Sequence, residues 1–418
     1  MVQVLSRSWA LLLGMMLLMV GNGLQGTLLG VRGGIEGFST FEMSFVMSAY
    51  FAGFLVGSRV APEMIRRVGH VRVFAALASF VSAILILYPA FANPVAWACG
   101  RIAIGFCFSG VYVAAESWLN NSADNSNRGK ALSIYMIVQM FGIVSAQALL
   151  ALGDATGYAL FIVSSVLVSI SFAPILLSVA PTPAFETAKP MPLRTLIETS
   201  PLSCLGMFLL GGVFSAQFGM SAVYGTAAGL SITQISLFVS SIYIGALLMQ
   251  YPIGLFSDRV DRRLVILVVA LLGGLASVVA FLNGEYFGAL LIVAFFIGGT
   301  SNPLYSLLIA YTNDYLEADD MAAACGGLIF INGVGAISGP LIIGWVMDRY
   351  GPESFFVVIA VLMLTMAAYA GFRMTQRTRV GIDDGAYAPV MPNASLVAVE
   401  VASEYYIETS LESEINDT

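Results

Sequence analysis

The sequence predicts an all-α integral membrane protein whose twelve transmembrane helices form two pseudo-symmetric bundles of six. Of its 418 residues, 58% are hydrophobic and only 10% are charged, whereas soluble domains carry about 25% charge. The apolar residues gather in twelve long runs, each close to the roughly 20 residues that cross a bilayer. A proline-rich stretch separates the first six runs from the last six, and the two sets partly repeat each other.

Each run is expected to be a helix, because a segment in hydrocarbon must pair its backbone polar groups within itself. The first run follows Arg7 and is followed by no small-residue cleavage site, so we expect a retained helix rather than a signal peptide. The runs cover about residues 8–30, 40–61, 72–92, 94–116, 131–152, 158–180, 202–228, 233–256, 264–282, 286–312, 322–346 and 353–373.

Lysine and arginine are distributed unequally between the two sets of loops. With the N-terminus inside, fifteen of the 18 basic residues lie on the cytoplasmic side, and only Arg32 and Arg349 lie outside. Cytoplasmic loops of membrane proteins carry an excess of positive charge. We therefore predict that both termini are cytoplasmic. The remaining cation, Arg101, falls inside the fourth run.

The middle and the end of the chain differ in composition from the apolar runs. Residues 181–201 contain five prolines and four charged residues, which indicates a cytoplasmic linker with a short helix near Leu193–Thr199. After Arg379 the chain has eight acidic residues and no lysine or arginine, which is typical of a disordered tail. We predict an N-terminal bundle (1–180), a linker (181–201), a C-terminal bundle (202–375) and an acidic, disordered cytoplasmic tail (376–418).

Short motifs recur between the halves. Asp154-x-x-Gly157 precedes the sixth run and Asp348-x-x-Gly351 precedes the twelfth. A charged turn, Gly254-Leu-Phe-Ser-Asp-Arg-Val-Asp-Arg-Arg263, lies between the eighth and ninth runs, and a degenerate copy begins at Gly57, between the second and third. The copy has Ala61 where the second turn has an aspartate, with Glu63 nearby.

These charged turns resemble the signature of the major facilitator superfamily. Further strings resemble its bacterial YcaD-like branch: Glu116-Ser-Trp-Leu-Asn120, Gly69-His-Val-Arg72, the run from Gln250 to Asp258, and Thr312-Asn-Asp314. The resemblance implies a twelve-helix secondary transporter of the bacterial inner membrane, which works as a monomer by rocking one half against the other. It does not settle the cargo.

The second charged turn is expected to close the cytoplasmic side of such a transporter. Asp258 can accept hydrogen bonds from a neighbouring helix N-terminus, and the arginines can pair with acids or lipid phosphates. Glu116 could also pair with Arg128 across the following loop as a gate; ordinary interfacial ion pairs are the alternative. The candidate latch and gate residues are Gly254, Asp258, Arg259, Arg262, Arg263, Glu116, Arg128, Arg66, Arg67 and Asp314.

Arg101 is the leading candidate for a substrate contact. It lies about seven residues into its run, roughly 10 Å deep, where a cation costs at least about 2.5–3.5 kcal/mol. It should therefore face the cavity and have a partner; a structural cation held by carbonyls or by a polar neighbour is the alternative. The other cavity candidates are Asn22, Gln25, Arg32, Tyr112, Gln139, Gln217, Tyr224, Tyr243, Asn302, Tyr305 and Asn332.

Several function classes find no support in the sequence. It has no Ser/His/Asp arrangement, no phosphate-binding glycine loop, one histidine, and four cysteines that all lie in apolar runs. We expect no enzyme, catalytic residue, metal, cofactor or nucleic-acid partner; the expected partners are the bilayer, a small-molecule substrate and either a proton or a counter-solute. The leading hypothesis is a secondary active or facilitative transporter of a small organic solute that works by alternating access, with an organic anion as one candidate cargo. The alternatives are a proton-coupled sugar or drug transporter or efflux protein and, more remotely, a sensor acting through the tail.

Overall fold

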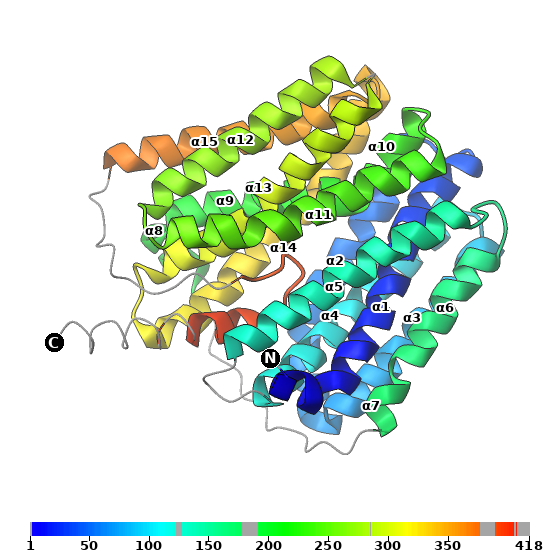
Figure 1. Ribbon diagram of the computed structural model, residues 1–418, viewed down its shortest axis with the longest axis horizontal. Helices are drawn as coiled ribbons and strands as arrows, with labels where there is room; N and C mark the ends of the chain where they lie inside the picture. The colour runs from blue at the N-terminus through cyan, green and yellow to red at the C-terminus, as the bar shows by residue number, and fades with distance from the viewer. Residues whose placement is uncertain are drawn as a thin grey trace.

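The computed structural model describes residues 2–122, 128–177, 191–284, 286–376, 389–404 and 407. Within these ranges the chain is helical and contains no strand (Figure 1). The helices of the first half are α1 (Val2–Ile35), α2 (Thr40–Val68), α3 (His70–Ala90), α4 (Pro94–Ser122), α5 (Arg128–Leu152), α6 (Ala159–Ser171) and α7 (Ala173–Leu177).

The second half opens with a short helix, α8 (Leu193–Thr199), at the position that the sequence predicts. It continues with α9 (Pro201–Ser215), the π-helical turn η2 (Ala216–Met220), α10 (Ser221–Ala227), α11 (Ile232–Ser257), α12 (Arg262–Asn283), α13 (Phe287–Asn313), α14 (Ala318–Tyr350) and α15 (Ser354–Gln376). The segments α6–α7 and α9–η2–α10 each form one continuous crossing, so twelve helices are long and apolar enough to span a membrane. The predicted twelve-helix fold is confirmed.

The two halves repeat their local structure. Ser39 and Ser231 each begin a helix with a capping box, in which the serine side chain accepts from the backbone of Glu42 or Gln234, an arrangement that satisfies the free N–H groups of the first turn. Just before these caps, Gly37 and Gly229 adopt positive φ angles of 79° and 73°, which glycine tolerates readily. The two halves therefore share this turn chemistry.

Glycines also set the closest helix contacts within each half. A Cβ on Gly53 or Gly105 would collide with the backbone between α2 and α4, and one on Gly245 or Gly298 would collide in the same way between α11 and α13. Small residues let membrane helices approach through their backbones. These equivalent pairs give each bundle a rigid, repeated core.

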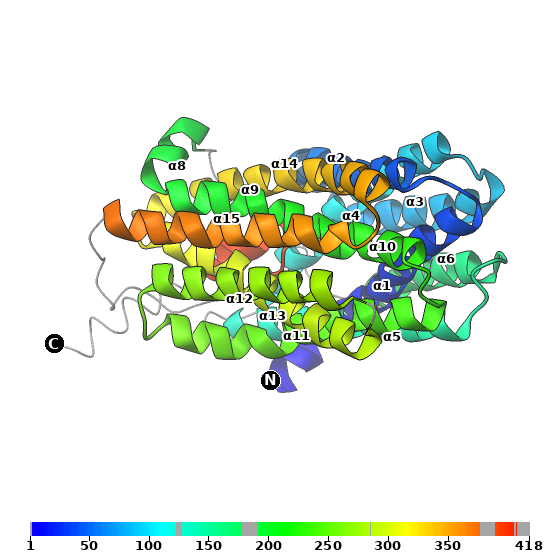
Figure 2. The same cartoon turned by 90° about the horizontal axis from the view of Figure 1, so that it is seen from above.

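The interface between the halves has two different ends. We call the face at which α2, α4, α11 and α13 end the terminal face, because α1 begins there and residues 389–404 lie there (Figure 1). At the opposite face α1 packs on α10 and α2 packs on α14. At the terminal face, residues 389–404, which we call the tail segment, lie between the halves (Figures 1 and 2).

The expectation of a disordered tail is wrong for the tail segment. Residues 396–404 are helical, and the apolar side chains from Val390 to Ala402 are largely buried. The acidic charge of the tail predicted disorder. The apolar residues between the acids of this segment are numerous enough to be buried against the helices. Residues 377–388, 405–406 and 408–418, which the same expectation covers, lie outside the described residues.

Candidate functional site

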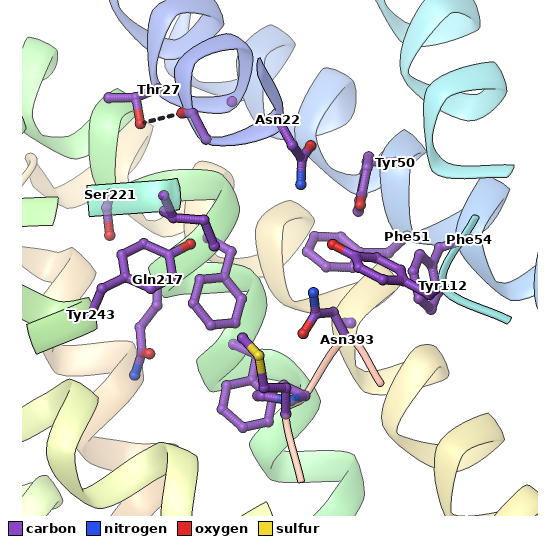
Figure 3. A pocket seen from close by; sticks show the side chains of 18 of the residues that line it. Asn22, Thr27, Tyr50, Phe51, Phe54, Tyr112, Gln217, Ser221, Tyr243 and Asn393 are labelled. Atoms are coloured by element: carbon purple, nitrogen blue, oxygen red, sulfur yellow. Dashed lines mark hydrogen bonds between the residues drawn. The ribbon is translucent and has the colours of Figure 1, made fainter. Parts of the chain in front are cut away.

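A cavity of about 120 Å³ lies between the two halves, near the middle of the helices (Figure 3). The first half lines it with α1, α2, α4 and α5, and the second half with α9, η2, α10, α11 and α14. The tail segment adds Met391, Pro392 and Asn393. A water needs roughly 10–15 Å³ by this measure, so the cavity has room for roughly ten water-sized groups.

Arg101 lies on the cavity wall and is 3% exposed. Its Nη1 donates to Gln25 Oε1 at 3.3 Å, its Nη2 contacts Met47 Sδ at 3.4 Å, and its guanidinium lies 4.7 Å from the centre of the Tyr50 ring. Its Nε has no hydrogen-bond partner. None of the ion pairs among the described side chains involves Arg101. The arginine is thus held by neutral groups, and its charge is uncompensated there.

Two groups of aromatic rings face the cavity, one from each half. In the first half, Tyr50 and Tyr112 lie on either side of Phe54, with ring centres 6.1 Å apart in both pairs. In the second half, Phe218 stacks on Phe214 at 5.7 Å and on Tyr243 at 5.3 Å. Figure 3 shows Tyr112 and Tyr243 on opposite sides of the space. A flat or apolar portion of a solute fits between such faces.

Amide side chains supply the neutral polar groups of the wall. Gln217 lies in the π-helical turn η2 and donates to Ser301 Oγ at 2.7 Å, while its Oε1 has no partner. Gln147 donates to the Gly23 carbonyl at 3.4 Å, and its Oε1 is also without a partner. Buried polar atoms are nearly always hydrogen-bonded, and π-helical turns are frequent at functional sites. Both oxygens are buried beside the cavity without a hydrogen-bond partner.

The structure brings together many of the side chains that the sequence singled out. Alongside these predicted residues, it places on the cavity wall several aromatic side chains outside the sequence-based list, namely Phe51, Phe54, Phe214 and Phe218. The spacing of Phe54 after Tyr50, and of Phe218 after Phe214, puts each pair on one helix face and could have revealed them. The predicted residues on the wall are Asn22, Gln25, Arg101, Tyr112, Gln217, Tyr243 and Asn332.

Other predicted cavity residues lie elsewhere. Arg32 pairs with Glu36 at 2.6 Å and donates to the carbonyls of Ala155 and Thr156, so its guanidinium is engaged. Tyr224 stacks on Phe355 in the core of the second half. Gln139, Asn302 and Tyr305 are also absent from the wall of this cavity: Gln139 lies beside the tail segment, Asn302 donates to the carbonyl of Gly298, and Tyr305 packs on Phe214.

The second charged turn forms ion pairs within the second half. Arg262 pairs with Asp314 and lies 3.9 Å from Asp258, so it joins the terminal ends of α11, α12 and α13. Arg263 pairs with Asp261 at 2.8 Å, and Asp261 also caps α12 by accepting from the Arg263 backbone. Gly254 is buried and Arg259 is exposed. A latch between the halves remains a prediction.

The first charged turn is simpler, because Glu63 pairs with both Arg66 and Arg67 on the surface of α2. The predicted gate between Glu116 and Arg128 involves a side chain outside the described ones, that of Arg128. Glu116 itself is 2% exposed and accepts from the Ser395 backbone at 2.8 Å and from Tyr135 Oη at 3.4 Å. Sequence reasoning missed the tail segment as its partner, because contacts across 279 positions leave no local pattern.

Comparisons with known proteins agree with this architecture. The family model described as Major Facilitator Superfamily matches residues 11–228 and again 202–389. An uncharacterized MFS-type transporter of Yersinia enterocolitica is 25% identical over 85% of this chain and 92% of its own length. The uncharacterized MFS-type transporter YcaD of Escherichia coli O45:K1 is 26% identical over 84% of this chain and 91% of its own.

Among solved structures, a mutant of the nucleoside transporter NupG superposes with a TM-score of 0.75 at 15% identity, covering 88% of this chain and 100% of that one. A second NupG structure gives a TM-score of 0.70 at the same identity. At this identity the likeness concerns the fold. With the family matches and the twelve spanning helices, it leads to one conclusion: the chain is a multi-pass bacterial membrane protein that belongs to the Major Facilitator Superfamily of transporters, in its YcaD-like branch.

Proposed function

We propose that this transporter carries a small organic anion across the bacterial inner membrane by alternating access. The observation that supports it is Arg101, a buried guanidinium on the cavity wall that has no acidic partner among the described residues. A buried charge is costly unless it is paired. Arginine binds carboxylates with two parallel hydrogen bonds, so a bound carboxylate would supply the missing charge.

The remaining wall fits the rest of such a solute. The two aromatic groups, which include Phe54 and Phe218, would enclose an apolar or planar portion. Gln147 and Gln217 offer unpaired oxygens to hydroxyl or amide donors. The size of the cavity favours a solute of roughly ten non-hydrogen atoms. Because both bundles that line the cavity belong to one chain, we propose that the monomer is the functional unit.

The orientation and coupling follow from charge. The excess of positive charge at the terminal face supports cytoplasmic termini. The cavity wall, as far as the structure describes it, contains an arginine and tyrosines but no carboxylate. We therefore propose facilitated transport or exchange rather than proton coupling at this cavity. We also propose that the second charged turn closes the cytoplasmic side as a latch, and that the domain boundaries are those predicted from the sequence.

A neutral sugar-like solute is the second candidate, because the unpaired oxygens of Gln147 and Gln217 suit hydroxyl donors. In that case Arg101 would position Gln25 and Tyr50 instead of binding charge. A proton-coupled carrier is a further alternative. It would need Glu116 as its proton-binding group, and Glu116 lies outside this cavity, beside the tail segment.

Ligand-dependent thermal stabilisation of the purified protein tests the proposal. A ligand that binds the folded state raises its melting temperature with concentration. Small carboxylic acids, matched uncharged amides, sugars and cationic drugs would be compared on wild type, Arg101→Gln and, as a control on the same wall, Asn332→Ala. We expect one or more carboxylates, but not their amides, to stabilise wild type and Asn332→Ala while leaving Arg101→Gln unchanged. Equal stabilisation of all three proteins by a neutral compound would contradict the proposal.

A further inference from the structure

The tail segment bridges the two halves at the terminal face. On the side of the first half, the Ser395 N–H donates to Glu116 Oε2 at 2.8 Å, and Asn393 Nδ2 donates to Gln139 Oε1 at 3.4 Å. Glu116 belongs to α4 and Gln139 to α5. A buried carboxylate that accepts a backbone N–H is a strong, charge-assisted contact. The segment is therefore anchored at a defined point of the first half.

The second half holds the same segment through α13 and α14. Ser306 Oγ accepts from the Val390 N–H at 2.8 Å and donates to the Val390 carbonyl at 3.2 Å. Farther along, Ser403 Oγ accepts from Asn313 Nδ2 at 3.2 Å and lies 3.6 Å from Cys325 Sγ. The second half thus holds the two ends of the segment, and the first half holds its middle, so its position in the gap is fixed.

Apolar packing accompanies these polar contacts. Most of the circumference of its helix is buried, and the less buried positions, Leu396, Glu400 and Glu404, follow one another at intervals of four residues along a single edge. Removing apolar surface from water is the main force that drives such docking. The buried apolar residues are Val390, Met391, Ala394, Val397, Ala398, Val399, Val401 and Ala402.

The segment also forms one wall of the cavity. Met391, Pro392 and Asn393 line it together with Arg101 and Tyr112, and Figure 3 shows Asn393 pointing into the cavity near Tyr112. The opposite face is closed by direct contact of α1 with α10 and of α2 with α14. A solute that leaves toward the terminal face would have to displace these residues.

We propose that residues 389–404 are an intramolecular plug, which closes the terminal-face entrance of the cavity and must undock before a solute passes through it. The consequence for transport rests on the function proposed above. The docking itself needs no substrate, so its test can fail or succeed independently of the cargo and of the transport activity.

A disulfide tests whether the segment docks as described. Ser403→Cys would place a thiol where Ser403 Oγ now lies, 3.6 Å from Cys325 Sγ, close enough for a bond after small adjustments. Mild oxidation of the purified protein should join the two cysteines, as peptide mapping by mass spectrometry would show. Adding Cys325→Ala should abolish the bond. Absence of the bond in the Ser403→Cys protein would overturn the docking.

Thiol labelling tests whether the segment closes the cavity. Ser58 lines the cavity from α2, so Ser58→Cys reports access, in a background of Cys99→Ser and Cys325→Ala. In nanodiscs, a hydrophilic maleimide should react at least tenfold faster with this reporter when the chain is ended after residue 388. An unchanged labelling rate would overturn the plug even if the disulfide forms.

A point variant guards against a truncation that damages the fold. Ser395→Pro removes the N–H that binds Glu116, whereas Ser395→Ala keeps it. We expect several-fold faster labelling of the Ser58→Cys reporter in Ser395→Pro, and a smaller increase in Ser395→Ala, which loses only the hydroxyl contact with Glu116. Equal rates in these two variants would show that the hydrogen bond to Glu116 does not hold the plug.

Discussion

At the opposite face the halves meet helix to helix, whereas at the terminal face a separate piece of chain lies between them. Gly30 of α1 contacts Ala222 of α10, and Gly344 of α14 contacts Ser44 of α2, with no space for a further carbon atom. At the terminal face the tail segment takes this place and contacts both Glu116 and Ser306. On the plug proposal, opening of the first end requires movement of the bundles, while opening of the second also requires release of a short segment.

The largest effect is expected between these ends, at Arg101. Arg101→Gln should weaken binding of the carboxylate ligand by about 100-fold, since losing one partner of a buried charged hydrogen-bonded pair costs about 2–5 kcal/mol and tenfold corresponds to about 1.4 kcal/mol. Calorimetric titration would measure it.

The same substitution should raise the melting temperature of the ligand-free protein, because it removes a buried charge without an acidic partner among the described residues. Arg101→Lys, which keeps the charge but lacks the planar fork, is the matched control and should bind more weakly than wild type without becoming more stable. Unaltered affinity in Arg101→Gln would make the arginine structural.

The opposite face provides the next test. A Cβ on Gly30 would lie 2.6 Å from the Ala222 side chain, while one on Gly26, about one turn away on the same helix, would meet nothing within 4 Å. Gly30→Ala should therefore loosen this end and speed labelling of a Thr27→Cys reporter from outside intact cells, by about tenfold. Gly26→Ala should leave the rate within twofold. Similar rates in both variants would mean that this contact does not keep the face closed.

The charged turns allow a smaller, structural test at the terminal face. Arg262 and Asp314 are 8% and 10% exposed, whereas Arg194 and Glu198 form a pair that is 90% and 64% exposed. Breaking a buried pair costs several kcal/mol and breaking an exposed one costs little. Asp314→Asn should lower the melting temperature by roughly 5 °C and Glu198→Gln by less than about 1 °C. A comparable decrease in both would show that the second charged turn contributes no special stability.

The smallest expected effect is a pH dependence of the plug. Burial, together with the neighbouring carboxylate of Glu404, raises the pKa of Glu400 from 4.5 to about 7 when the segment is docked; Cys325 of α14 also faces it. Below pH 4.5 Glu400 is protonated in both the docked and the free tail, and docking is strongest. Between pH 4.5 and 7 Glu400 loses its proton only in the free tail, so docking weakens as pH rises. Because thiols react faster as pH rises, each rate is divided by the rate of the same reporter in the chain ended after residue 388 at the same pH. This ratio should rise a few-fold from pH 5 to 8, but not in Glu400→Gln. An equal pH response in both proteins would assign the dependence to another group.

The helices and their order could be predicted from the sequence because apolar runs, glycine pairs and capping serines are local signals. Arg101 and the amides of the cavity could also be singled out, since a polar residue in an apolar run is conspicuous. Tyr224 and Asn302 are also polar residues in apolar runs, yet they pack elsewhere. The sequence of a helix that is buried on all sides does not show which of its faces meets the cavity. The tail segment could not be predicted: its acids suggested disorder, and its partners, Glu116 and Ser306, lie far away in sequence.

The most direct test of the account is counterflow in proteoliposomes, with the carboxylate that best stabilises the purified protein. Vesicles loaded with unlabelled carboxylate should take up the labelled compound through wild type, and uptake should fall to background in Arg101→Gln. The uncharged amide of the same compound should not exchange in either protein. Exchange of the amide as fast as the acid, or undiminished uptake by Arg101→Gln, would contradict transport of an organic anion bound by Arg101.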